Sequence, residues 1–241
     1  MTESLDPRPA VVAWCARAGF GFILLFFAGL LPIAHFVPPV APSLDAAEVA
    51  RLYQEHGSAI RIGGAVCMLG SFLMLAFGAA LADQIRGIGR LPRALAMLQV
   101  ASFASAVLII ELPLACWGAA AMRAAQRDPD VTQALNDVGW LCFVGGVGPY
   151  ISWVLSTGIA VLLDHSRRPV FPRWSGYLSV FVAVAQVPGA FVALFVTGPL
   201  AWNGLFAWWI PLTTFFLWSA CMIHLTVRAT AGSGSPIRYD A

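Results

Sequence analysis

The residue best suited to chemistry in this chain is Glu111, the one acidic residue well inside a long apolar stretch. A carboxyl group placed in hydrocarbon is costly, so an intramembrane glutamate is by default a candidate functional residue. Glu111 can form a hydrogen bond with Gln186 or Tyr150, or pair with Arg61 reaching inward. It can also serve as the acid or base of an intramembrane enzyme.

A layer of polar residues lies at the same predicted depth as Glu111. Counting about 1.5 Å per residue from the outer end of each apolar stretch places Ser71, Tyr150, Gln186 and Thr213-Thr214 near the bilayer midplane. Prolines collect at similar levels: Pro32, Pro113, Pro149, Pro188 and Pro211. Each proline frees a backbone carbonyl that a neighbour or a wet cavity must satisfy. The layer predicts a midplane pocket, although small polar residues and prolines also serve helix packing alone.

A second polar group is predicted at the outer rim of the same segments. It contains His35, Arg61, Asn136 and Asp137. With Glu111, Tyr150, Gln186 and Ser71 from the midplane layer, these four complete the candidate ligand-binding set. The simpler interpretation of His35 is an interfacial residue and not a ligand-binding one.

Motifs of other functional classes are absent from the sequence. The four histidines have no metal or haem spacing, and the five cysteines form no CxxC pair. No P-loop, G-x-S-x-G, H-E-x-x-H or GxGxxG motif occurs, and no long basic face is available for nucleic acid. We therefore expect no metal, no cofactor and no nucleic-acid partner.

The composition places the candidate residues in a membrane protein. Apolar residues make up 59% and charged residues 11% of the 241 residues, against about 45–50% and about 25% in soluble proteins. Crossing the hydrocarbon core takes about 20 apolar residues. Six stretches meet that length: 15–37, 60–82, 94–121, 139–163, 174–197 and 203–227. We predict an all-α polytopic membrane bundle with six transmembrane helices, in contact with membrane lipids.

The arginines predict the orientation. All fourteen basic residues are arginines, and ten of them lie on the side that holds both termini. Short arginine-rich loops stay in the cytoplasm, and a lysine-free, alanine-rich chain indicates a GC-rich bacterial genome. We therefore predict a bacterial inner-membrane protein with both termini in the cytoplasm. Its parts would be a cytoplasmic segment 1–14, a transmembrane domain 15–228 and a disordered cytoplasmic tail 229–241.

Two outer connections carry signals for helix starts. Asp45-x-x-Glu48 has the pattern of a capping box, with Gly57 as a stop signal. Asp128-Pro129 combines an N-cap with proline at the first helical position. We predict two short amphipathic helices on the outer surface.

A weak internal repeat is also present. Gly63-Gly64 and Gly145-Gly146 are each followed, eighteen or nineteen residues past the second glycine, by an aspartate and then arginines. This spacing suggests three repeated helical hairpins, although the general charge pattern of membrane proteins explains it equally well.

Three short segments carry a family resemblance. Pro172-Arg173-Trp174-Ser175-Gly176-Tyr177, Asn136-Asp137-x-Gly139-Trp140 and the stretch Gly198 to Gly204 resemble uncharacterised six-helix bacterial integral membrane proteins grouped as domains of unknown function. The resemblance implies six spans and carries over no activity, cofactor or catalytic residue.

Three functions stay open at this point. The first is binding or transport of a lipophilic small molecule in a midplane pocket that opens outward, with Glu111, Tyr150 and Gln186 as polar contacts. The second is a non-catalytic membrane subunit or scaffold that holds a membrane-protein partner. The third is an intramembrane enzyme using Glu111.

Overall fold

The computed structural model describes residues 8–88 and 93–232 and confirms the predicted all-α bundle, because these residues contain helices and no strand. Six helical segments are long and apolar enough to cross a membrane. The elements are α1 (Arg8–Ala28), η1 (Gly29–Ile33), α2 (Ala46–Arg86), α3 (Arg93–Met122), η2 (Ala124–Gln126), α4 (Pro129–Gly145), α5 (Val147–Leu163), α6 (Arg173–Gln186), η3 (Val187–Leu194), η4 (Leu205–Trp209) and α7 (Ile210–Gly232).

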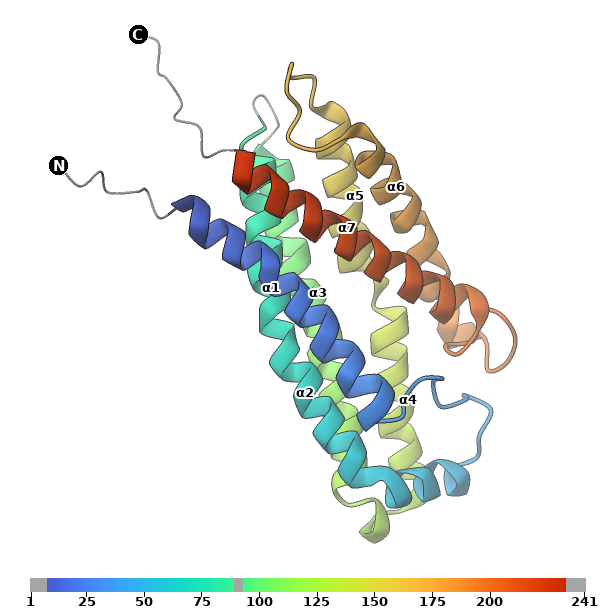
Figure 1. Cartoon of the computed structure of the whole chain (residues 1–241). Coiled ribbons are helices and arrows are strands. Elements are labelled where there is room, and N and C mark those ends of the chain that lie inside the picture. The colour runs from blue at the N-terminus through green and yellow to red at the C-terminus, as the bar shows by residue number, and fades with distance from the viewer. Residues whose placement is uncertain (1–7, 89–92, 233–241) are drawn as a thin grey trace, which may run out of the picture.

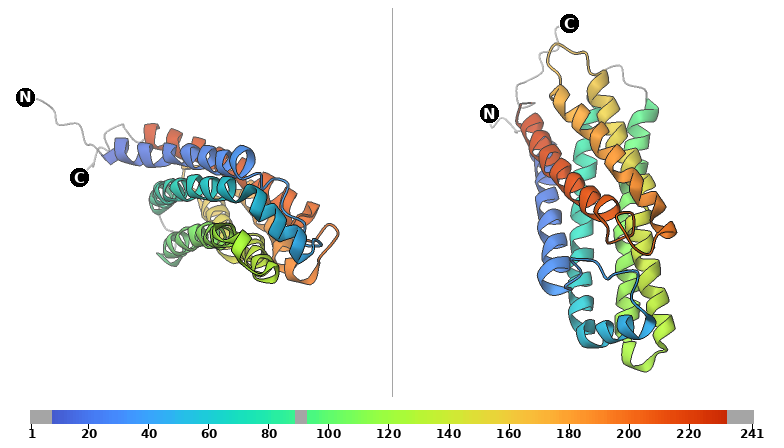
Figure 2. Two further views of the ribbon diagram at one scale, coloured as in Figure 1. Left: turned by 90° about the horizontal axis from the view of Figure 1, so that it is seen from below. Right: turned by 90° about the vertical axis from the view of Figure 1, so that its right-hand side faces the viewer.

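The spans close into a ring in chain order. Each span packs against the next along the chain, and α7 returns to α1. Figures 1 and 2 show α7 crossing the bundle diagonally, close to α1 where α1 begins and far from it where α1 ends. The beginning of α1 and the end of α7 lie at one end of the bundle, here called the terminal end. The opposite end, with residues 34–45 and η2, is called the distal end.

Proline positions explain where the spans change helix type. A proline has no N–H, and its ring clashes with the carbonyl four residues earlier. Helix α1 ends at Ala28, four residues before Pro32, and helix α4 ends at Gly145, four residues before Pro149. Near Pro188 the α-helix of span five tightens into the 3-10 helix η3. Three of the six spans are therefore broken within the bundle.

The two predicted outer helices exist, but neither is a separate element. The capping box of Asp45 and Glu48 is formed, with both backbone N–H groups hydrogen-bonded to the partner side chain. The expected stop at Gly57 is wrong: α2 runs unbroken from Ala46 to Arg86. Gly57 instead lets α2 pack closely on Ala121, whose carbonyl oxygen would lie 3.1 Å from a Cβ there. The first turns of α2 bend away from the rest of the helix (Figure 2).

The second outer helix is the beginning of span four. Asp128 caps it by accepting a hydrogen bond from the Asp130 amide, and Pro129 is its first residue, as predicted. The helix does not lie on the outer surface, because Thr132 and Asn136 are buried against the bundle.

The terminal helices run past the predicted span bounds, and the two glycine pairs of the predicted repeat differ from each other. Helix α1 already begins at Arg8 and α7 continues to Gly232, so residues 8–14 and 229–232 extend the spans. The rest of the predicted terminal segments, 1–7 and 233–241, lies outside the described residues. Gly63-Gly64 sits inside the continuous helix α2, whereas Gly145-Gly146 marks the break between α4 and α5. The two halves of the proposed repeat thus have different local structures.

A buried aspartate organises the connection between α5 and α6. The Asp164 side chain is 6% exposed, and its two carboxylate oxygens accept hydrogen bonds from the Ser166 and Val170 amides, both at 3.0 Å. Burial by itself raises the pKa of this carboxyl. The hydrogen bonds, together with nearby His165, outweigh burial and lower the pKa below its ordinary value.

Candidate ligand-binding pocket

A pocket lies inside the ring of helices where three spans change direction. It adjoins the break between α4 and α5, the end of α6 and the π-helical start of α7. Its volume is about 60 Å³. The lining residues are Phe22, Phe26, Ile110, Phe143, Val144, Val147, Tyr150, Gln186, Ala207, Trp208, Pro211, Leu212, Phe215 and Phe216.

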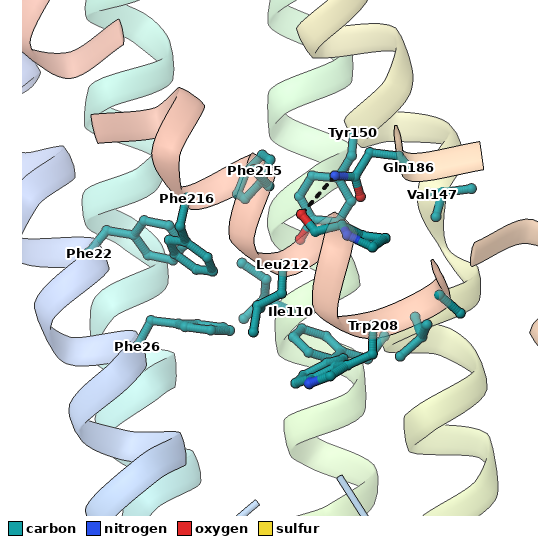
Figure 3. A pocket seen from close by; sticks show the side chains of 14 residues that line it. Phe22, Phe26, Ile110, Val147, Tyr150, Gln186, Trp208, Leu212, Phe215 and Phe216 are labelled. Atoms are coloured by element: carbon teal, nitrogen blue, oxygen red, sulfur yellow. Dashed lines mark hydrogen bonds between the residues drawn. The ribbon is translucent and has the colours of Figure 1, made fainter. Parts of the chain in front are cut away.

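Seven aromatic rings make the wall largely apolar. Phe22 and Phe26 of α1 face Phe215 and Phe216 of α7 (Figure 3). The Phe26 and Phe216 ring centroids are 4.9 Å apart, within the usual range for interacting aromatic rings. Such a wall is suited to an apolar or aromatic ligand.

Tyr150 and Gln186 are the lining residues whose side chains carry oxygen atoms, and a third lining residue, Trp208, has a buried indole N–H without a partner among the described residues. Figure 3 shows both at the end of the pocket opposite Phe22 and Phe26. The Gln186 side chain is 6% exposed, and its amide nitrogen donates to the Pro211 carbonyl oxygen at 3.0 Å. Among the described residues, neither the Gln186 side-chain oxygen nor the Tyr150 hydroxyl has a hydrogen-bond partner. None of the lining residues is charged.

Buried aromatic clusters adjoin the pocket at both ends. Toward the distal end, the Trp140 ring lies 5.5 Å from Trp208 of the pocket wall and 4.6 Å from Trp117. Phe36, which is 1% exposed, packs on Trp117 and Trp140. Toward the terminal end, Trp153 and Trp218 pack on each other and on Phe215. Aromatic side chains therefore lie between the pocket and the distal end of the bundle.

Residues 34–45 hold the distal cluster in place. The Trp202 indole donates to the Val40 carbonyl at 2.7 Å, and the Gln133 amide donates to the Leu44 carbonyl at 3.0 Å. His35 lies in this segment with an exposed side chain and a φ of 55°, a left-handed conformation that is uncommon for a residue other than glycine. His35 lies away from the pocket wall.

Glu111 does not line the pocket. Its carboxyl oxygen lies 2.7 Å from the Ser71 hydroxyl, across the seam between α2 and α3. Ser71 also lies 2.8 Å from the Met68 carbonyl oxygen. Both Leu108 and Leu112, which flank Glu111 on α3, are exposed on the outside of the bundle. The structure thus joins Glu111 to Ser71 and separates both from Tyr150 and Gln186.

The rim residue Asn136 is the centre of a buried network. Its side-chain oxygen accepts hydrogen bonds from the Tyr53 hydroxyl at 3.1 Å and the Trp140 indole at 3.2 Å. Its amide nitrogen donates to the Asp137 carboxylate at 3.0 Å. Asn136 and Asp137 therefore support the distal aromatic cluster, about two turns of α4 away from the pocket wall. Arg61 donates to the Gly57 carbonyl of its own helix at 3.3 Å and, among the described residues, pairs with no carboxylate.

A buried polar seam between α3 and α5 was not predicted. The Gln99 amide nitrogen lies 2.9 Å from the Ser156 hydroxyl and 2.6 Å from the Thr157 hydroxyl. The Ser102 and Ser152 hydroxyls pair at 2.8 Å. The Gln99 side-chain oxygen is one of four buried side-chain atoms without a partner among the described residues, the others being Thr132 Oγ1, Trp153 Nε1 and Trp208 Nε1.

The aromatic pocket wall was also missed by the sequence prediction. Phe22 and Phe26 are four residues apart, as are Trp208 and Leu212, so each pair shares a helix face. This spacing was a usable signal, but it was masked because lipid-facing positions are equally apolar. Among the described residues, no group of three or more histidines, cysteines and carboxylates is placed to hold a metal ion.

Comparison with known proteins adds no relative. No protein-family model, no curated protein and no solved structure matches this chain. The resemblance to six-helix bacterial membrane proteins stays an expectation, and the function has to be inferred from the pocket.

Proposed function

We propose that this protein binds a lipophilic small molecule in the pocket between α1, α5, α6 and α7, and that it carries the molecule in the membrane. The observation that supports the proposal is an aromatic cavity inside the ring with two oxygen atoms that lack hydrogen-bond partners, those of Tyr150 and Gln186. Protein interiors are close-packed, and polar side chains inside a membrane bundle tend to face a partner or a cavity. Both features are expected of a site that binds a ligand.

The site fits a carrier better than a scaffold or an intramembrane enzyme. A scaffold uses its outward faces and does not need a lined cavity inside the ring. An enzyme based on Glu111 needs room for a substrate beside that carboxyl, and the nearest polar partner there is Ser71, on the α2–α3 seam. The pocket instead offers neutral contacts, which suit binding and release.

We further propose that the protein resides in a bacterial inner membrane with both termini in the cytoplasm. The first turn of α1 and the last turn of α7 share the terminal end of the bundle, which also carries most of the arginines. Short arginine-rich loops stay in the cytoplasm. Reporter fusions at Gly87 and Ala124 should report opposite sides of the membrane; the same side for both would overturn this orientation.

Photolabelling tests the proposed pocket. A phenyl diazirine bearing a pentyl chain, added to proteoliposomes, should label residues of the segments 143–150 and 207–216 on illumination. Ala207 lines the pocket and is 2% exposed, so Ala207→Leu should occupy part of the space and lower this labelling at least about fivefold. Ala220→Leu, a change in the same span away from the pocket, should leave it unchanged.

Two further measurements keep the test decisive. The thermal unfolding midpoint of Ala207→Leu shows whether that variant stays folded, and Glu111→Gln should label like the wild type because Glu111 lies outside the pocket. Labels confined to lipid-facing residues such as Phe72 and Leu108, in a folded protein, would refute the proposal.

A further inference from the structure

The polar atoms of the pocket have a specific hydrogen-bonding pattern. The Gln186 amide group has its nitrogen fixed toward the Pro211 carbonyl oxygen, since a carbonyl oxygen requires a donor. The Gln186 side-chain oxygen is therefore left as an acceptor in a side chain that is 6% exposed. The Tyr150 hydroxyl can both donate and accept. The two groups are not hydrogen-bonded to each other, so a third group is needed to satisfy both.

On this basis, and resting on the proposed function, we propose that the ligand carries a neutral hydroxyl group that binds between Tyr150 and Gln186. A hydroxyl can donate its proton to the Gln186 oxygen and accept from the Tyr150 hydroxyl at the same time. A ketone, ester or ether oxygen accepts only, and would leave the Gln186 oxygen unpaired. An alkyl group would leave both oxygens unpaired.

The pocket also selects against charge. All fourteen lining residues are neutral, and an ion moved from water into such surroundings needs a partner of opposite charge. Glu111 belongs to the α2–α3 seam, where its carboxyl contacts Ser71. A carboxylate or an ammonium group would find no counter-ion among the residues of the pocket wall.

The rest of the ligand should be aromatic or at least apolar. Phe22, Phe26 and Phe216 pack on one another at one side of the pocket, and Phe215 packs on Phe216 (Figure 3). A volume of about 60 Å³ exceeds the roughly 10–15 Å³ that one water requires on a comparable measure, yet it is too small for a whole lipid. The ligand class that fits is therefore a phenol or similar hydroxyl-bearing ring, held by its polar end.

Matched probes that differ in one group test this proposal. The probes are para-pentylphenol, para-pentylanisole and para-pentylbenzoate, each used to compete with the diazirine label in proteoliposomes. Concentrations are corrected for partition into the same vesicles without protein. We expect the phenol to compete about tenfold better than the anisole, the effect of one buried hydrogen bond and its unpaired partner. The benzoate should be at least about a hundredfold weaker than the phenol.

Two variants assign the preference to its atoms. Gln186→Leu should abolish the advantage of phenol over anisole, because the acceptor is gone. Tyr150→Phe, which keeps the ring, should weaken phenol and anisole together by about five- to tenfold. Arg61→Gln, which lies away from the pocket wall, is the control and should change the affinity for neither probe.

The outcomes test the hydroxyl assignment and the proposed function separately. Equal competition by phenol and anisole in the wild type would overturn the hydroxyl assignment but not the pocket. This is the result expected if a water molecule occupies the polar end. Tighter binding of the benzoate would overturn the assignment too. Pocket labelling that none of the probes displaces would count against the proposed function itself.

Discussion

The contact between η1 and α2 yields a sharp prediction, because two adjacent glycines of α2 have opposite surroundings. A Cβ atom added at Gly63 would overlap the Gly29 carbonyl oxygen and would lie 2.8 Å from the Ala34 Cβ. A Cβ atom at Gly64 would meet only Leu114, at 3.9 Å. Gly63→Ala and Gly64→Ala are therefore the same change in composition at neighbouring positions, one crowded and one open.

The expected difference follows from two opposing effects. Replacing glycine by alanine inside a helix stabilises it by about 1 kcal/mol, and this gain applies to both variants. Crowding applies only at Gly63, where carbon atoms normally 3.5–4.0 Å apart would be about 1 Å too close. The Gly29 carbonyl that is overlapped accepts the Ala34 N–H at 2.9 Å, so the π-turn itself must move. Such overpacking costs about 1–3 kcal/mol, and we take the upper end.

The free energy of unfolding should thus fall by about 2 kcal/mol in Gly63→Ala and rise by about 1 kcal/mol in Gly64→Ala. At about 2–4 °C per kcal/mol for a chain of this size, the unfolding midpoints should differ by about 6–12 °C. Thermal unfolding in one detergent, followed by tryptophan fluorescence, measures this. A Gly63→Ala midpoint equal to or above that of Gly64→Ala would refute the close packing of η1 on α2.

Two further predictions concern the ends of the bundle. Because the folded-state pKa of Asp164 is depressed, its contribution is present above the unfolded pKa of about 4 and is lost as pH falls through the lower folded value. Asp164→Asn should therefore expose the α5–α6 connection to protease at pH 7 as strongly as wild type is exposed once the pH has fallen below the lowered pKa of Asp164. Asp83→Asn, at an exposed position, should behave like wild type. At the distal end, Asn136→Leu removes the acceptor of two buried donors and should lower the free energy of unfolding by about 2–4 kcal/mol. Tyr53→Phe should lower it by only about 1 kcal/mol. Denaturant unfolding measures both values, and the reverse order would contradict the network.

The sequence was sufficient for the elements and their order. An apolar stretch of about 20 residues has few alternatives to a membrane helix, because lipid offers no partner to an open backbone. Local cap signals were also reliable: Asp45 and Asp128 cap helices as predicted, since caps depend on residues within one turn. The local stop signal at Gly57 was wrong, because α2 runs through it. The proline at position 149 also ended its helix where steric rules require.

The candidate site was predictable only in part. Depth counting placed Tyr150 and Gln186 at one level, and the structure brings both to one pocket. The same counting grouped Glu111 with them, yet Glu111 points to Ser71 on another seam. Depth along a helix follows from residue number, whereas the direction of a side chain around the helix depends on how the spans pack.

What the sequence by itself determined is thus the one-dimensional content of this protein: six apolar spans, two capped helix starts and the position of each polar residue along its span. Tertiary structure alone decided which faces meet, because a helix in lipid is apolar all round and carries little contrast between its inner and outer sides. The ring of spans, the aromatic pocket and the pairing of Gln186 with the Pro211 carbonyl arise from contacts between segments that no local pattern specifies.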